Sequence, residues 1–411
     1  MNSRRVLITG LSTELGGRLA QALERQGDLD AIVGIDGDDP RHELHRTEFV
    51  RVDTGHGPLL ARIIRAAAID TVLDTRLLAD PLRGPAPEVN IAGTRSLLQA
   101  CGDSPVRKLV FKSSAHYYGL HRDDPAFLSE EMVRPAAART ALEREIVAAE
   151  LQVAEFSARN RDVVITVVRL ATPIGGEERT AHQALLGLPV VPAVLGYDPR
   201  CQFIHEDDIV GALQHAVLHS LPGTFNAAAD GVLAFSEVVS LLGKAILPVL
   251  PPWGMGFTAT QLRRLGLKVP VELIRELVFG RGLDNRRLKA AGYAYRYTTR
   301  EAVLRLRAQQ RLRPLLQSGE AYRYEREVEE FLRWSPSVQT APAASADGGS
   351  AGNAPPFSAY DELSAGELIE LLSSLEADAL ARLRTYEVAH LARGEVLTAL
   401  DRQLALRAGH R

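Results

Sequence analysis

The N-terminal stretch contains the feature that most constrains the fold: an aliphatic run, a glycine-bearing turn and then a helix. Residues 6–8 read Val-Leu-Ile, Thr9 and Gly10 form the turn, and Gly16 and Gly17 open an apolar-periodic helix. Glycine at such a turn lets the backbone lie close to the pyrophosphate of a dinucleotide, whose charge the helix N-terminus stabilises. The pattern therefore predicts a nucleotide-binding strand–turn–helix unit.

Two positions qualify this prediction. A second apolar run, residues 31–35, ends at Asp36, about twenty residues after the turn, where an acid can bind ribose hydroxyls. Thr13, however, stands where T-G-x-x-G-x-x-G has its middle glycine, and a side chain there crowds the closest approach of backbone to phosphate. A purely structural turn is the alternative that the motif by itself leaves open.

Composition narrows the class of protein. A chain of 411 residues with 46% hydrophobic residues should hold more than one compact unit, and its net charge of -3 argues against a general nucleic-acid or anionic-membrane binder. Its two cysteines, Cys101 and Cys201, have no metal-type spacing, and no apolar run reaches the length of a membrane span. The chain enters a strand almost at once, so no signal peptide is expected. We expect a cytoplasmic, disulfide-free protein without a metal site.

Strand and helix patterns alternate through the first half of the chain. Further strands are predicted at 48–53, 71–74, 108–112 and 163–168, with helices from about residue 58, over 89–101 and over 143–156. Such alternation predicts an α/β fold with a doubly wound parallel sheet, in which ligands bind at the carboxyl ends of the strands.

The motifs together resemble the extended short-chain dehydrogenases/reductases of the NAD-dependent epimerase/dehydratase family, and in particular actinobacterial proteins described as UDP-glucose 4-epimerase-like. The resemblance covers about residues 4–308. The matching pieces are Thr9-Gly10 with Gly16, Asp36, Asp53, Asn90-Ile91-Ala92-Gly93-Thr94, Ser113-Ser114-Ala115, Tyr118-Gly119, Val168-Arg169-Leu170, Phe203-Ile204-His205 with Asp208, and Gly223-Thr224-Phe225-Asn226.

The resemblance implies NAD as cofactor and assigns roles to individual residues. The turn from Thr9 and Gly10 to Leu15 and Gly16 would face the pyrophosphate, Asp36 the adenosine ribose, and Asp53 the adenine amino group with Val52 beside the ring. Asn90 would lie behind the active site and Ser114 would be the catalytic serine. Two alternatives stay open, because Asp53 could simply N-cap a turn and Asn90 could simply cap the helix that it opens.

The catalytic dyad of the family, Tyr-x-x-x-Lys, is absent. Counting from Arg169 and Glu150 places it at Leu142 and Ile146, and nowhere in the chain does lysine follow tyrosine at four residues. In the family the lysine lowers the pKa of the tyrosine, so that a phenol can exchange protons at neutral pH. Whether the chain is an enzyme is therefore left open, with an inactive Rossmann-fold binding or scaffold protein as the alternative.

Other residues near the expected site are candidates for the missing roles. His116 and Tyr117 share a loop with Ser114, and His116 titrates near neutrality, although an exposed loop histidine is the simpler interpretation. Arg76 replaces a small residue of the family and could either bind a phosphate or pair with Asp74 or Asp36 in the cofactor groove.

The second half is expected to supply the substrate lobe. Thr172 stands at the substrate-loop position and Arg200 near that of the diphosphate arginine, so a nucleotide-sugar is implied. Apolar residues at 247–253 and 257–278 suit an apolar small molecule or ordinary packing.

The predicted segments are a Rossmann domain over 1–175, completed by later strands, a substrate-binding lobe over 176–309, a helical extension over 310–334, a flexible linker over 335–358 and a helical tail module over 359–411. The tail shows no chemistry and is expected to bind a protein partner. Relatives often dimerise through the helices that here begin near Val89 and Glu143, which implies a homodimer.

Overall fold

The computed structural model describes residues 5–53, 55–102, 104–120, 124–125, 127–132, 138–175, 180–249, 270–312, 365, 369, 372, 377–389 and 393–408. The chain divides into two compact units, Met1–Leu316 and Gln317–Arg411. The predicted linker over 335–358 and most of the helical extension lie outside the described residues.

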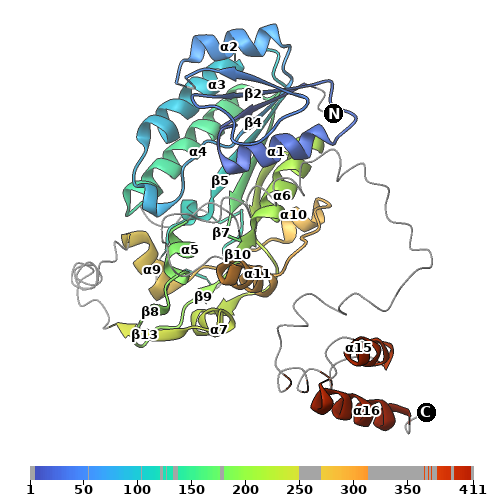
Figure 1. Cartoon of the computed structure of the whole chain (residues 1–411). Coiled ribbons are helices and arrows are strands. Elements are labelled where there is room, and N and C mark those ends of the chain that lie inside the picture. The colour runs from blue at the N-terminus through green and yellow to red at the C-terminus, as the bar shows by residue number, and fades with distance from the viewer. Residues whose placement is uncertain are drawn as a thin grey trace. The chain divides into compact units, whose positions relative to one another are not determined.

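A seven-stranded parallel sheet forms the centre of the first unit (Figure 1). Its strands are β1 (Arg5–Thr9), β2 (Ala31–Asp36), β3 (Thr47–Arg51), β4 (Thr71–Asp74), β5 (Lys108–Ser114), β6 (Val164–Leu170) and β11 (Gly223–Ala227). Their order is β11-β6-β5-β4-β1-β2-β3, and all neighbouring pairs are parallel. The predicted doubly wound sheet is thus confirmed.

Helices cover both faces of this sheet. On one face lie α1 (Glu14–Glu24) and α6 (Glu206–Leu218), and on the other α2 (Gly57–Ala66), α3 (Thr94–Gly102) and α4 (Ala141–Arg159). The apolar stripes of these helices and the aliphatic strands make two cores, one on each side of the sheet. Because β1 and β4 are parallel neighbours, the loops that follow them lie at the same edge of the sheet.

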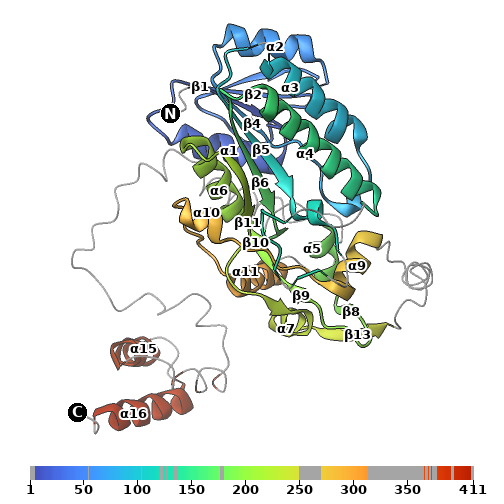
Figure 2. The ribbon, with the colours of Figure 1, turned by 180° about the vertical axis from the view of Figure 1, so that it is seen from behind.

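A smaller lobe is built after β6 (Figure 2). Its helices are α5 (Ala181–Leu186), α7 (Phe235–Leu241), α9 (Val271–Phe279), α10 (Arg286–Ala290) and α11 (Thr299–Leu312). Three two-stranded sheets accompany them: β7 (Thr172–Ile174) with β10 (Phe203–His205), β9 (Arg200–Cys201) with β12 (Leu233–Ala234), and β8 (Val190–Val194) with β13 (Ala245–Val249). A third apolar core joins α5, α7, α9 and α11, which fixes α9 beside the sheet edge that carries the ligand-binding loops.

The second unit contains α15 (Ala377–Ala389) and α16 (Gly394–Ala408). Leu380, Leu383 and Tyr386 of α15 pack with Val396 and Leu400 of α16 in a small core of their own. Among the described residues of both units, no helix combines the length and the apolar character that crossing a bilayer requires.

Candidate active site

The turn after β1 has the geometry that the glycines predict. Gly10 adopts a φ of +79°, and a Cβ at Gly16 would lie 2.0 Å from the Gly10 carbonyl oxygen, so the helix and the turn touch through their backbones. Thr13 caps α1: its hydroxyl accepts a hydrogen bond from Gly16 N at 3.0 Å and donates one to the Gly10 carbonyl at 2.7 Å. The threonine that replaces the middle glycine therefore stabilises this turn by closing it on itself.

Asp36 lies at the end of β2 and is held by the same turn. Its Oδ2 accepts hydrogen bonds from Ser12 N at 2.9 Å and Ser12 Oγ at 2.5 Å, and its Oδ1 accepts one from Gly37 N at 2.8 Å. Ser12 thus occupies both lone pairs of Oδ2, and Oδ1 keeps one lone pair that can accept a hydrogen bond from a ribose hydroxyl. The carboxylate is fixed where the Asp36 spacing predicts a ribose contact.

The adenine-side candidates have local roles. Asp53 Oδ1 accepts a hydrogen bond from Gly55 N at 2.8 Å, and its carbonyl accepts one from His56 N at 3.0 Å, so Asp53 shapes the turn before α2. Val52 is buried in the core on that side of the sheet. The structure thus gives Asp53 the turn-forming contacts that the sequence left as its alternative role.

Arg76 pairs with Asp74 at the end of β4. The guanidinium Nε lies 2.8 Å from Asp74 Oδ1 and NH2 lies 3.1 Å from Oδ2, and the Arg76 side chain is only 7% exposed. Thr9 Oγ1 donates a third hydrogen bond to the same carboxylate at 2.6 Å. Of the alternatives for Arg76, the structure shows the ion pair with Asp74, which neutralises the guanidinium within the groove.

Asn90 holds the loop that follows β4. Its Oδ1 accepts a hydrogen bond from Leu78 N at 2.8 Å, while its Nδ2 donates to the Leu78 carbonyl at 3.0 Å and to Glu145 Oε2 at 2.9 Å. The side chain is fully buried, so Asn90 fixes the loop backbone from behind.

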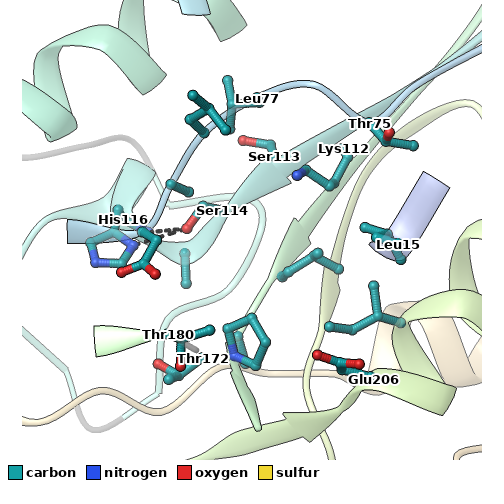
Figure 3. Close-up of a pocket in the computed structure, with 18 of the residues that line it drawn as sticks. Leu15, Thr75, Leu77, Lys112, Ser113, Ser114, His116, Thr172, Thr180 and Glu206 are labelled. Carbon is teal, nitrogen blue, oxygen red and sulfur yellow. Dashed lines mark hydrogen bonds between the residues drawn. The ribbon is translucent and has the colours of Figure 1, made fainter. Parts of the chain in front are cut away.

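A cavity opens between the β1 turn, the carboxyl ends of β4 and β5, and the smaller lobe (Figure 3). Leu15 lines it from the start of α1 and Thr75 from the loop after β4. Lys112, Ser114 and His116 line it from β5 and the short helix that follows. From the lobe it is lined by Thr172, Thr180, His182 and Arg281. The predicted residues Leu15, Ser114, His116 and Thr172 are thus brought to one space.

Ser114 and His116 form the polar centre of the cavity. Ser114 Oγ lies 2.9 Å from His116 Nδ1, and the backbone N of His116 donates a hydrogen bond back to Ser114 Oγ at 3.3 Å. His116 is not the exposed loop histidine of the simpler interpretation, because only 8% of its surface is exposed. On its other side, His116 Nε2 lies 3.1 Å from Glu276 Oε1 of α9.

Tyr117 and Arg200 lie elsewhere. The ring of Tyr117 stacks on the Arg169 guanidinium, with 3.5 Å between the ring centroid and Cζ, and Tyr117 lines a separate groove along α4. Arg200 lines a smaller pocket next to the cavity, shared with Thr172 and His182, and its own side chain is exposed. The structure therefore does not bring Tyr117 to the hydroxyl of Ser114.

The positions of the missing dyad are part of the core. Leu142 is 3% exposed and Ile146 is fully buried, and both belong to the apolar cluster that includes Leu77. Leu77 also lines the cavity. The two residues that the resemblance assigns to the dyad positions are therefore apolar and belong to the core.

Sequence analysis missed Glu276, His182 and Arg281. All three lie in the part of the chain without strict strand–helix alternation, and Glu276 lies within the apolar 257–278 stretch, which gives no signal of a polar site. Only the tertiary packing of α5 and α9 brings them to His116.

Comparison with known proteins assigns the family. The model of the NAD dependent epimerase/dehydratase family matches residues 6–228. The chain belongs to this family. An uncharacterized protein of Mycobacterium tuberculosis is 33% identical over 311 residues, covering 72% of this chain and 81% of the relative. A UDP-glucose 4-epimerase of Azospirillum brasilense is 28% identical over 251 residues, covering 53% of this chain and 69% of the relative.

Solved structures share the fold of this family member. MoeE5 in complex with UDP-glucuronic acid and NAD superposes with a TM-score of 0.58 at 20% identity, covering 75% of this chain and 99% of MoeE5. The UDP-glucose 4-epimerase of Thermotoga maritima with UDP-glucose gives a TM-score of 0.58 at 18% identity, with 75% and 99% covered.

Proposed function

We propose that the chain binds NAD along the carboxyl edge of its sheet and acts on a hydroxyl-bearing substrate beside Ser114. The observation that carries this proposal is the Ser114–His116 pair, whose Oγ and Nδ1 lie 2.9 Å apart in the cavity beside the β1 turn. The pair offers proton exchange at a site whose fold belongs to an NAD-dependent family.

The residues around the β1 turn fit the adenosine diphosphate half of NAD. Gly10 and Gly16 leave no side chain between the turn and α1, and the first amides of α1, at Glu14 and Leu15, suit the pyrophosphate. Asp36 Oδ1 keeps a lone pair for a ribose hydroxyl. When bound, NAD supplies hydride transfer, and the chain supplies the proton chemistry.

His116 is the group that can exchange a proton here. An imidazole titrates near neutral pH, and through Ser114 Oγ it can take the proton of a substrate hydroxyl or return it. In this proposal the Ser114–His116 pair replaces the Tyr-Lys dyad, whose positions hold Leu142 and Ile146.

A nucleotide-sugar is the substrate class that we favour. The neighbours MoeE5 and Thermotoga maritima epimerase are described with UDP-glucuronic acid and UDP-glucose. In this chain Lys112 and Arg281 line the cavity beside Thr172, a lining that suits an anionic, hydroxyl-rich ligand.

A second candidate function is a catalytically inactive binding protein on the same fold. Two features favour it. Leu142 and Ile146 are apolar core residues at the positions that the resemblance assigns to the catalytic pair, and the buried Asp74–Arg76 ion pair stands where the family has small cofactor-lining residues.

The test separates binding from turnover. Calorimetry with NAD, and mass spectrometry of the denatured protein, report binding; interconversion of UDP-glucose and UDP-galactose reports turnover. Loss of a general acid–base group typically costs a factor of about 10² to 10⁴, so Ser114→Ala and His116→Ala should abolish turnover while Tyr117→Phe leaves it intact. NAD binding without turnover would favour the inactive protein, and absence of NAD binding would overturn the proposed enzyme and leave the inactive scaffold protein.

A further inference from the structure

The carboxylate of Glu276 lies between two histidines of the cavity. Its Oε1 lies 3.1 Å from His116 Nε2, and its Oε2 lies 2.5 Å from His182 Nε2 on α5. Arg281 adds a third cationic contact, with NH2 3.3 Å from Oε1. Only 11% of the Glu276 side chain is exposed, so an ionised carboxylate here requires such partners.

Electrostatics keep this carboxylate charged. Burial by itself raises the pKa of Glu276, but the positive charges of His182 and Arg281 lower it well below its ordinary value. A carboxylate that is ionised across the neutral range acts on the histidines as a fixed negative charge.

This charge sets the orientation of the proton on His116. The contact between His116 Nε2 and Glu276 is close, but it is not aligned as a hydrogen bond, so its effect is electrostatic. A neutral imidazole beside it is favoured with its hydrogen on Nε2, which leaves the Nδ1 lone pair directed at the Ser114 hydroxyl. The backbone hydrogen bond from His116 N to Ser114 Oγ occupies an oxygen lone pair and leaves the hydroxyl hydrogen available to Nδ1.

We propose that Ser114 and His116 form a proton relay, in which Glu276, itself held by His182, is the positioning residue that makes His116 a base toward Ser114. The proposal rests on the proposed function and adds the group that makes it work. When the substrate hydroxyl gives its proton to Ser114 Oγ, the serine proton passes to His116 Nδ1. The electron pair of the broken O–H bond becomes the second bond of a carbonyl as the C–H bond of the same carbon breaks and its hydrogen leaves as hydride, which NAD, when bound, would accept. Glu276 stays ionised and stabilises the imidazolium that results.

His182 is the second histidine that Glu276 stabilises. It contacts the second oxygen of Glu276, and its side chain is 13% exposed and lines the cavity. Protonation of either histidine is stabilised by the one carboxylate, so the charge of one ring opposes the charging of the other.

Other ionisable groups surround the cluster of His116, Glu276, His182 and Arg281. The other ionisable groups whose charges act on Arg281 are Glu143, Asp124 and Arg275, and the charge of Glu276 also acts on Cys201. Two histidines and a carboxylate also suit a metal ion, but the Arg281 guanidinium beside the carboxylate opposes a bound cation. Among the described residues no group of three such ligands is arranged to hold a metal.

The relay is tested by nuclear magnetic resonance on the full chain with ¹⁵N-labelled histidine, with His116→Gln used to assign the His116 signals. In the wild-type protein, the neutral His116 should carry its hydrogen on Nε2. Glu276→Gln should move the His116 hydrogen from Nε2 toward Nδ1, because the negative charge that favours a hydrogen on Nε2 is removed. His182→Gln should leave the hydrogen on Nε2, because Glu276 is still present.

Glu143→Gln is the matched control. Glu143 is a buried acid of α4, and its Oε1 lies 3.7 Å from NH1 of Arg275, which shares helix α9 with Glu276. It does not contact His116 in the described structure. Glu143→Gln should leave the His116 hydrogen on Nε2. A wild-type His116 with its hydrogen on Nδ1 would overturn the relay even if Glu276→Gln did not fold, and so would an unchanged His116 tautomer in a folded Glu276→Gln protein.

These measurements do not depend on turnover. If the Nε2 tautomer and its change in Glu276→Gln appear but NAD does not bind, the proposed function fails and the effect of Glu276 on His116 stands. If NAD binds and turnover occurs, but the pH profile of turnover does not move in Glu276→Gln, the relay fails and the proposed function stands.

Discussion

Asp74, the last residue of β4, and Arg76, two residues further on, form a buried ion pair with two side-chain hydrogen bonds, directly beside the glycine turn. A Cβ placed on Gly10 would lie 3.2 Å from Arg76 Cγ, so the arginine stem packs against the turn that would face the pyrophosphate. The pair links the loop after β4 to the loop after β1, because Thr9 Oγ1 and the carbonyl of Thr9 bond to Asp74 and to Thr75 respectively. Its main effect is therefore on the stability of the cofactor edge.

The first prediction concerns this ion pair. Arg76→Ala should lower the free energy of unfolding by about 3–5 kcal/mol, because it leaves the Asp74 carboxylate buried without its partner. Asp74→Asn combined with Arg76→Met should cost much less than Arg76→Ala alone. Urea denaturation measures both, with Arg286→Ala as control, since Arg286 makes the same kind of pair with Asp284 in solvent. Equal losses for the single and the double variant would contradict the prediction.

The second prediction is the pH dependence of that contribution. Burial raises the pKa of Asp74, but the charge and hydrogen bonds of Arg76 lower it further, so the folded-state pKa lies below the ordinary value. A carboxyl with a lowered folded-state pKa contributes stability above its unfolded pKa of about 3.9, and this contribution is lost as the pH falls through the folded value. The wild-type protein should therefore lose more stability than the Asp74→Asn, Arg76→Met variant between about pH 5 and pH 3. Parallel stability curves in urea would show that Asp74 does not contribute.

The third prediction concerns cofactor choice. NAD should bind more tightly than NADP, because the Asp36 carboxylate would repel a 2′-phosphate. Ser12→Ala should weaken NAD binding by about 1 kcal/mol or more, since both Ser12 hydrogen bonds act on Asp36 and the hydroxyl supplies the shorter one. Calorimetry with both nucleotides decides it, and Asp36→Asn should reduce the preference. Equal binding of NAD and NADP by the wild-type protein would show that Asp36 does not face the ribose.

The parts of the fold and site that are local in sequence could be predicted. The glycine spacing around Gly10 and the strand–helix alternation depend on neighbouring residues, and the structure has the turn and the parallel sheet in place. Counting along α4 placed the dyad at Leu142 and Ile146. The structure shows that both side chains are buried, and their correspondence to the dyad stays a prediction.

What depends on packing between distant segments could not be predicted. From the sequence, Arg76 could pair with a phosphate, with Asp74 or with Asp36, and only the packed structure shows that its partner is Asp74. Glu276 is separated from His116 by most of the substrate lobe and sits among apolar neighbours, so no periodicity indicates that its carboxylate meets two histidines. Tyr117 follows His116 directly, yet the short helix turns its ring toward Arg169.

The last prediction tests whether the loss of the dyad is built into the core. Ile146→Lys should not restore a family-like lysine but should destabilise the protein by about 3 kcal/mol or more, because Ile146 is fully buried in an apolar cluster and an unpaired charge there is uncompensated. Leu151→Lys on the same helix is the matched control, since Leu151 is 58% exposed and should tolerate the charge. Thermal and urea unfolding measure both variants. An Ile146→Lys protein as stable as the wild type would mean that the lysine reaches the cavity, and that α4 can still present a cation to a bound nicotinamide. Combining it with Leu142→Tyr would then be the direct route to a dyad-bearing variant.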